Sequence, residues 1–287
     1  MTSYEVDIED VEYLRHGDTA YLARVYQPRG KGPFPAVVEA HGGAWTSGER
    51  GGNDAINRAV AAGGVVVAAL DFRNPPAATY PGSVQDVNYG IRWLKAEAAR
   101  FNTRADWIGT MGTSSGGHLA VLAALKPLDP RYAAIKRPGA QTGVQADARV
   151  PFVVTLWPVI CPLGRYRAWT SPEARQKVSP RGGNPALSQV KYWLTEDAMA
   201  EGSAVLALER GDEVELPHIL YLQHPADPMH PRALMEQFVT NYRARGGVVR
   251  LSLFEGAAYD LPRSDPSSPA AKKVIAEIVA FIHGETG

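Results

Sequence analysis

Apolar and polar positions along the chain follow two periodicities, which predict alternating strands and helices. Alternation at 4–15 and 19–27 predicts two strands that turn at 16–18. Short apolar runs rich in β-branched residues are typical of buried parallel strands, and they lie at 35–40, 64–70, 107–111, 151–157, 218–222 and 248–254. Apolar residues at helical spacing predict helices at 53–62, 83–101, 118–125, 231–245 and 269–282.

This order of strands and helices predicts an α/β fold. Connected strands and helices form a mostly parallel, twisted sheet with helices on both faces. We expect one domain over residues 1–287. Residues 158–216 interrupt the alternation and are rich in Pro, Gly and aromatic residues. Because ligands of such sheets bind beyond the carboxyl ends of the strands, we expect this insertion to form a cap over the site.

Composition narrows the function classes. Lys plus Arg and Asp plus Glu both number 30, and this balance gives no support to nucleic-acid binding. Cys161 is the single cysteine, so no intrachain disulfide forms, which fits a reducing compartment. The first residues lack the basic start and apolar block of a signal peptide, and no apolar run reaches the roughly 20 residues of a membrane span. We therefore expect a cytoplasmic protein without membrane contact.

The segment Gly112-Thr113-Ser114-Ser115-Gly116 matches G-x-S-x-G and stands between a predicted strand and a predicted helix. This is the context of a nucleophile elbow, in which the serine projects from a strained turn. The helix N-terminus favours negative charge developing beside that serine. The alternative is a glycine-rich packing turn. The context favours Ser114 as a nucleophile.

A second glycine-rich segment, His41-Gly42-Gly43-Ala44-Trp45, follows an earlier predicted strand. Its backbone N–H groups, at Gly42, Gly43 and Ala44, are candidates for an oxyanion hole together with the N–H of Ser115. The alternative is a tight turn beside a packed His41, and we expect that histidine to be structural rather than a base.

The motifs HGGAW, Asp71-Phe72-Arg73, Tyr80-Pro81, Asp86 and 112–119 resemble the HGG(G/x)W esterases of the α/β-hydrolase superfamily. This group includes hormone-sensitive-lipase-like carboxylesterases, acetyl and feruloyl esterases, and kynurenine formamidases. The resemblance implies an α/β-hydrolase fold and hydrolysis of small esters or formamides without a cofactor. It also implies the order Ser, acid, His along the chain. Asp227, in the loop after the predicted strand at 218–222, matches the acid of the group.

The resemblance departs from the group at the base. The group has a histidine after the last strand, where this chain has Gly256-Ala257-Ala258-Tyr259. Alignment on the glycine therefore puts Tyr259 in the place of the triad histidine. A phenol with a pKa near 10 is a poor base at neutral pH, so this alignment predicts weak or altered turnover. His230, which flanks Asp227, is the best substitute histidine, and His118 is expected to be structural.

Three functions are compatible with these residues. The first is a cofactor-free serine hydrolase of small carboxylic esters, with Ser114, Asp227 and Tyr259 as an altered relay. The second is a lyase, cyclase or decarboxylase reaction in the same pocket, and the third is an inactive ligand-binding homologue. No metal site is expected. The sequence is compatible with a homo-oligomer but does not determine the oligomeric state. The aromatic residues near the insertion either line a substrate pocket or anchor the cap, and these are Trp157, Tyr166, Trp169 and Trp193.

Overall fold

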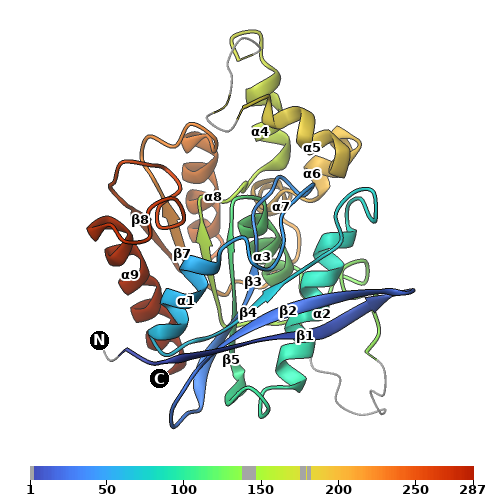
Figure 1. The fold of residues 1–287 in the computed structure, drawn as a ribbon. Coiled ribbons are helices and arrows are strands. Elements are labelled where there is room, and N and C mark those ends of the chain that lie inside the picture. The colour runs from blue at the N-terminus through green and yellow to red at the C-terminus, as the bar shows by residue number, and fades with distance from the viewer. Residues whose placement is uncertain (1–2, 138–146, 175–178, 180–181) are drawn as a thin grey trace.

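The computed structural model describes residues 3–137, 147–174, 179 and 182–287 and contains a sheet in the order β1-β2-β4-β3-β5-β6-β7-β8 (Figure 1). β1 and β2 are antiparallel to each other, and β2 is antiparallel to β4, whereas the other neighbours are parallel. The strands are β1 Val6–His16, β2 Thr19–Pro28, β3 Phe34–Ala40, β4 Val66–Leu70, β5 Thr103–Thr113, β6 Phe152–Leu156, β7 His218–Gln223 and β8 Val249–Leu253.

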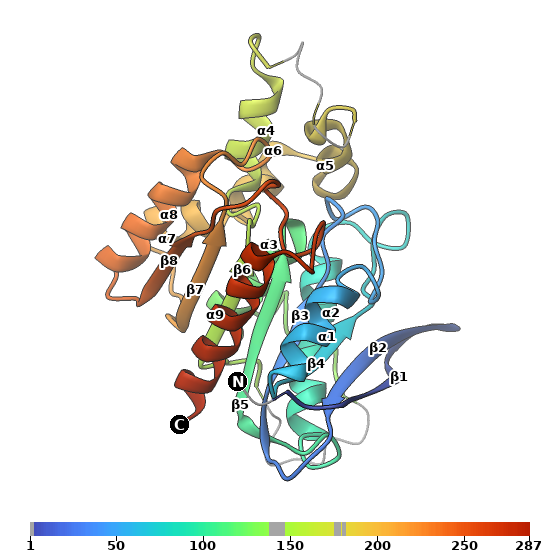
Figure 2. The same cartoon turned by 60° about the vertical axis from the view of Figure 1, so that its left-hand side comes forward.

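Helices cover both faces of this sheet. α1 (Asp54–Ala62) and α9 (Pro269–Thr286) pack together on one face, and Figure 2 shows them in front of the sheet. The other face carries α2 (Gly82–Ala96), α3 (Ser115–Leu125), α7 (Ala204–Arg210) and α8 (Arg232–Ala244). The predicted α/β fold class, a mostly parallel sheet between helices, is confirmed.

Side chains of the central strands alternate between two cores, one on each face. Val37 and Val67 lie in the core beneath α1 and α9, whereas Ala36 and Val66 lie in the core beneath α2 and α3. Every residue of β3, β4 and β6 is buried. Burial on both faces explains why these strands have continuous apolar sequences rather than an apolar–polar alternation.

Three short helices of the predicted insertion lie beyond the end of the sheet at which α3 begins (Figure 1). They are α4 (Pro162–Thr170), α5 (Pro185–Trp193) and α6 (Glu196–Glu201), and we call them the cap helices. Side chains of Cys161, Asn184 and Thr195 accept hydrogen bonds at their N-termini. The remaining helix of the segment 158–216, α7, instead packs against α3 and α8.

Aromatic contacts join the cap helices to the body. The Trp193 ring is 1% exposed and stacks on Tyr80, with the ring centroids 4.5 Å apart. Its edge meets Trp45, 5.3 Å away between centroids. Trp193 therefore anchors the cap helices. Trp157 packs on Phe254 in the core beneath α9, so it belongs to the body of the protein.

The helix predicted at 83–101 ends earlier, at Ala96, because residues from Glu97 onward form turns. The helix predicted from His118 begins at Ser115, since the glycines of the elbow are themselves helical. Among the described helices, none is long and apolar enough to cross a membrane.

Candidate active site

Ser114 stands at the turn between β5 and α3, as the elbow motif predicts. Its backbone has φ 52° and ψ −118°, a conformation that is strained for a residue with a side chain. Hydrogen bonds fix this turn: Ser114 N donates to Leu156 O at 3.0 Å, and Ser114 O accepts from Val159 N at 3.0 Å. A Cβ on Gly116 would lie 2.0 Å from Ala40 O, so glycine is needed for α3 to approach the end of β3.

An unbroken chain of contacts runs from Ser114 through His230 to Asp227. Ser114 Oγ lies 3.1 Å from His230 Nε2, and His230 Nδ1 lies 2.8 Å from Asp227 Oδ2. The side chains of His230 and Asp227 are 5% and 0% exposed, whereas Ser114 is half-buried and therefore reachable. This is the geometry of a Ser–His–Asp triad, with the serine partly exposed and its two partners buried.

The loop after β7 positions both partners of the serine. Asp227 Oδ1 accepts hydrogen bonds from Met229 N at 2.7 Å and from His230 N at 3.1 Å. This turn around an aspartate side chain brings the His230 ring back onto the second carboxylate oxygen, Oδ2. Gln223 Nε2 holds the turn from the end of β7 by donating to His230 O at 2.9 Å. The acid and the histidine thus come from one four-residue segment.

The prediction that Tyr259 stands at the position of the base is wrong. Within the described chain no hydrogen bond joins Tyr259 to Ser114 or Asp227. Tyr259 lies in the loop after β8, where it packs with Trp169 and Met229, and its ring centroid is 6.4 Å from that of His230. The alignment relied on the order of elements, whereas the turn at Asp227 brings the His230 ring between Ser114 and Asp227. The spacing Asp-x-x-His after a strand is the sequence signal for this arrangement.

The segment after β3 lies directly beside the elbow. A Cβ on Gly42 would lie 3.4 Å from the Cβ of Ser114. Gly43 and Ala44 have φ values of 137° and 53°, and Gly43 O accepts hydrogen bonds from Thr46 N and Ser47 N. The N–H groups of Gly43 and Ala44 donate no hydrogen bond to any other described residue.

Two further histidines near the site are held as structural groups. His118 Nε2 donates to Gly202 O at 2.7 Å, and His118 Nδ1 accepts from the indole N–H of Trp45 at 3.3 Å. Burial lowers the pKa of His118 to about 4, so its ring is neutral at physiological pH. His41 donates through Nδ1 to Gly42 O and stacks on Phe72, with a centroid distance of 4.2 Å. Burial also lowers the pKa of His41.

A buried carboxyl group, that of Glu39, is linked by hydrogen bonds to the residue that precedes Ser114. Glu39 on β3 is 1% exposed, and burial raises its pKa to about 7. Asn53 Nδ2 donates both to Glu39 Oε1 at 2.8 Å and to Thr113 Oγ1 at 3.0 Å. Thr113 directly precedes Ser114, so this network connects the carboxyl group to the backbone of the elbow. Among the residues with described positions, no group of three His, Cys, Asp or Glu residues could hold a metal ion.

Strand order, elbow and the Ser–His–Asp contacts together define an α/β-hydrolase-fold protein. Residues 24–165 match the BD-FAE family model. This match agrees with the resemblance to HGG-type esterases of the α/β-hydrolase superfamily that the motifs predicted.

Two curated relatives illustrate this similarity. A probable carboxylic ester hydrolase, LipM, from Mycobacterium tuberculosis is 36% identical over 52% of this chain and 34% of its own length. A probable isoprenylcysteine α-carbonyl methylesterase from Oryza sativa is 28% identical over 88% of this chain and 57% of its own length. The chain thus spans about a third to six-tenths of these relatives.

The fold is shared along nearly the whole chain. An esterase from Pyrobaculum calidifontis superposes with a TM-score of 0.76 at 22% identity, covering 98% of this chain and 85% of that one. Esterase B from Lactobacillus rhamnosis gives a TM-score of 0.77 at 18% identity, covering 98% and 87%. At these identities the structural likeness establishes the fold.

Proposed function

We propose that this protein hydrolyses small carboxylic esters through an acyl-enzyme on Ser114. The observation that carries the proposal is the contact chain from Ser114 Oγ to His230 Nε2 and from His230 Nδ1 to Asp227 Oδ2. A serine hydroxyl needs a base to become a nucleophile at neutral pH, and an imidazole suits that task. The similarity to carboxylic ester hydrolases supports the choice of an ester as substrate.

The chemistry follows from this geometry. His230 Nε2 takes the proton as Ser114 Oγ attacks the ester carbonyl, and Asp227 stabilises the imidazolium that forms. The N–H groups of Gly43 and Ala44, with that of Ser115 at the start of α3, hold the oxyanion, and Gly42 gives them room beside the serine. His230 then protonates the leaving alcohol, and a water molecule activated by His230 releases the acid. No step in this sequence uses a cofactor.

The sequence predicted weak turnover because no histidine follows the last strand. With His230 as the base, the proposal no longer requires turnover to be weak. Tyr259 then takes a different role in the proposal. Its position beside His230, in a cluster with Trp169 and Met229, makes it a wall of the substrate site rather than a proton acceptor. The contacts of His230 with Ser114 and Asp227 favour ester hydrolysis over the lyase, cyclase and ligand-binding alternatives in this proposal.

A fluorophosphonate probe tests the nucleophile directly. We expect rapid, stoichiometric labelling of Ser114 in the unmodified protein, together with turnover of p-nitrophenyl acetate. Ser114→Ala should abolish both, whereas Ser267→Ala, on an exposed loop far along the chain from the elbow, serves as the matched control. Labelling at another serine, or ester turnover that survives Ser114→Ala, would overturn the proposal.

A further inference from the structure

A buried arginine lies next to the proposed catalytic histidine. Arg165, on α4, is 3% exposed. Its Nε and Nη2 donate to one oxygen, Gln189 Oε1, at 3.0 and 2.9 Å. The guanidinium carbon lies 5.4 Å from the centroid of the Trp45 ring. These contacts fix the orientation of the guanidinium group, but both partners are neutral.

No carboxylate within the described chain forms an ion pair with Arg165. The exposed Arg167 on the same helix, by contrast, pairs with Glu196 at 2.8 Å. A buried cation without a counter-charge costs folding free energy, because desolvation is not offset by a partner. Asp227 is the acidic group whose field acts on Arg165, and it is already committed to His230. The lack of a counter-charge on Arg165 therefore calls for an explanation.

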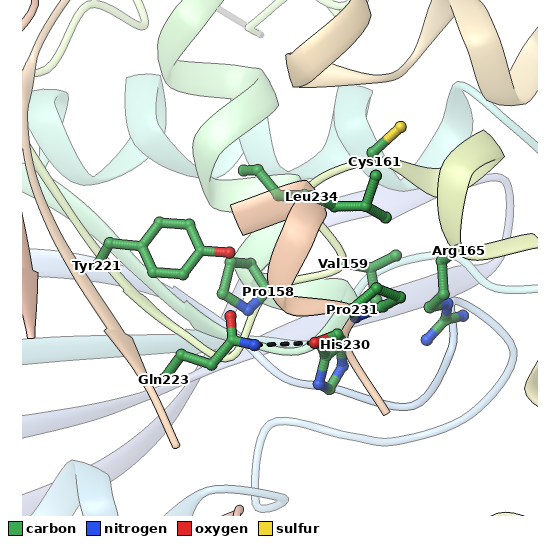
Figure 3. A pocket seen from close by; sticks show the side chains of 10 residues that line it. Pro158, Val159, Cys161, Arg165, Tyr221, Gln223, His230, Pro231 and Leu234 are labelled. Carbon is green, nitrogen blue, oxygen red and sulfur yellow. Dashed lines mark hydrogen bonds between the residues drawn. The ribbon is translucent and has the colours of Figure 1, made fainter. Parts of the chain in front are cut away.

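The position of this guanidinium indicates where a partner would come from. Arg165 and His230 line the same small cavity, whose volume is about 10 Å³, and Figure 3 shows Arg165 reaching from α4 to the level of His230. Trp45, beneath the guanidinium, follows Ala44 of the proposed oxyanion hole directly. Arg165 thus packs on the residue that follows the proposed oxyanion segment and shares a cavity with the proposed base, His230. Its Nη1 group donates no hydrogen bond to a described residue.

We propose that Arg165 is a specificity-determining residue that binds a carboxylate carried by the ester substrate. This inference rests on the proposed ester hydrolysis and narrows its substrate class to esters with an anionic group. A substrate carboxylate would accept hydrogen bonds from Nη1 and supply the counter-charge that the fold lacks. Arginine suits this task because its planar donors match a carboxylate and it stays protonated when buried.

Matched substrate pairs test the inference. Monoethyl glutarate and ethyl pentanoate differ in the carboxylate at the end of the acyl chain. In the second pair, 4-acetoxybutanoate and butyl acetate, the carboxylate is on the alcohol side. We expect the unmodified protein to prefer the carboxylate member of at least one pair in kcat/KM. Arg165→Met should lower that preference by about 10–100-fold, the range for hydrogen bonds to a charged group.

Arg167→Met is the control, since it removes an exposed arginine of the same helix and should leave the preference unchanged. Arg165→Lys keeps the charge but not the planar donors, so it should retain part of the preference, and it serves if the methionine variant does not fold. The inference is overturned if the esters are turned over and neither pair shows a preference, or if Arg165→Met lowers kcat/KM equally for both members of a pair. The second result would assign Arg165 to packing between Gln189 and Trp45.

A binding measurement separates this inference from the proposed hydrolysis. Calorimetry of monoethyl glutarate and 4-acetoxybutanoate with Ser114→Ala needs no turnover. We expect one of them to bind, and the double variant Ser114→Ala/Arg165→Met to lose that binding. Binding with no ester turnover in the unmodified protein would sink the proposed reaction and keep the Arg165 site. Turnover of neutral esters with no Arg165-dependent binding would support the proposed hydrolysis and overturn the Arg165 site.

Discussion

At the scale of single residues, the central assignment is the base. His230→Ala should lower kcat on p-nitrophenyl acetate by about 10²–10⁴-fold, the usual contribution of a general base. Tyr259→His should give no comparable gain, because an imidazole already lies between Ser114 and Asp227. Steady-state kinetics on the two variants checks both statements. A large gain from Tyr259→His, with little loss from His230→Ala, would return the role of base to residue 259.

The buried carboxyl of Glu39 makes a second residue-scale prediction, on stability against pH. Its pKa rises from 4.5 to about 7 on folding, because burial disfavours the charged form. Between these two values the folded state binds more protons than the unfolded state, so the free energy of unfolding falls as pH rises. This decrease in the free energy of unfolding is complete above pH 7 and amounts to roughly 3 kcal/mol. Below pH 4.5 the carboxyl is protonated in both states and contributes no pH dependence.

Glu39→Gln should remove this dependence and make the protein more stable than the unmodified one at pH 8. Asn57 Oδ1 has no hydrogen-bond partner among the described residues, so a rotated Asn57 amide can accept from the amide introduced at position 39. Urea unfolding at pH 5 and pH 8 measures the effect. Equal pH dependence in the two proteins would show that Glu39 is already ionised in the folded state at pH 5.

At the scale of elements, the turn after β7 gives Asp227 a structural role beside its proposed catalytic one. Oδ1 caps the backbone of the turn and Oδ2 contacts His230. Asp227→Asn keeps an oxygen for the turn but loses the charge, so we expect Tm to change little while kcat falls by about 10²–10⁴-fold. Asp227→Ala should lower both kcat and Tm, since the backbone N–H groups of Met229 and His230 lose their acceptor. A calorimetric scan beside the kinetics distinguishes the two variants, and equal Tm losses would contradict this division of tasks.

At the scale of the whole molecule, the helices of the segment 158–216 belong to two parts of the protein, the cap and the body. The cap helices α4, α5 and α6 lie beyond the end of the sheet, and Arg165 of α4 lines a cavity with His230. α7 instead contributes Ala204, Val205 and Leu208 to the core beneath α3 and α8. Replacing residues 162–201 with the corresponding cap segment of a related esterase should therefore change substrate preference and leave the body folded. Replacing the whole of 158–216 should destabilise the fold, because it removes a core helix.

Circular dichroism melts and an acyl-chain-length profile check this division. We expect cooperative unfolding in the shorter exchange, with an altered preference among p-nitrophenyl esters. The longer exchange should show a lower Tm or no folded protein. An unchanged chain-length profile after the shorter exchange would argue against a role of the cap helices in specificity.

The chain's periodicity by itself determined the sheet, the helices and the elbow, because strand and helix patterns reflect local burial and Ser114 needs only its own strand, turn and helix. Asp227 followed from its place after β7. The base did not follow, since sequence order suggested Tyr259 and only the folded turn brings His230 Nδ1 to Asp227. The sequence did not indicate a role for Arg165 either. Its burial beside His230 depends on how the cap helices pack on the body, because long-range packing decides which polar groups share a cavity.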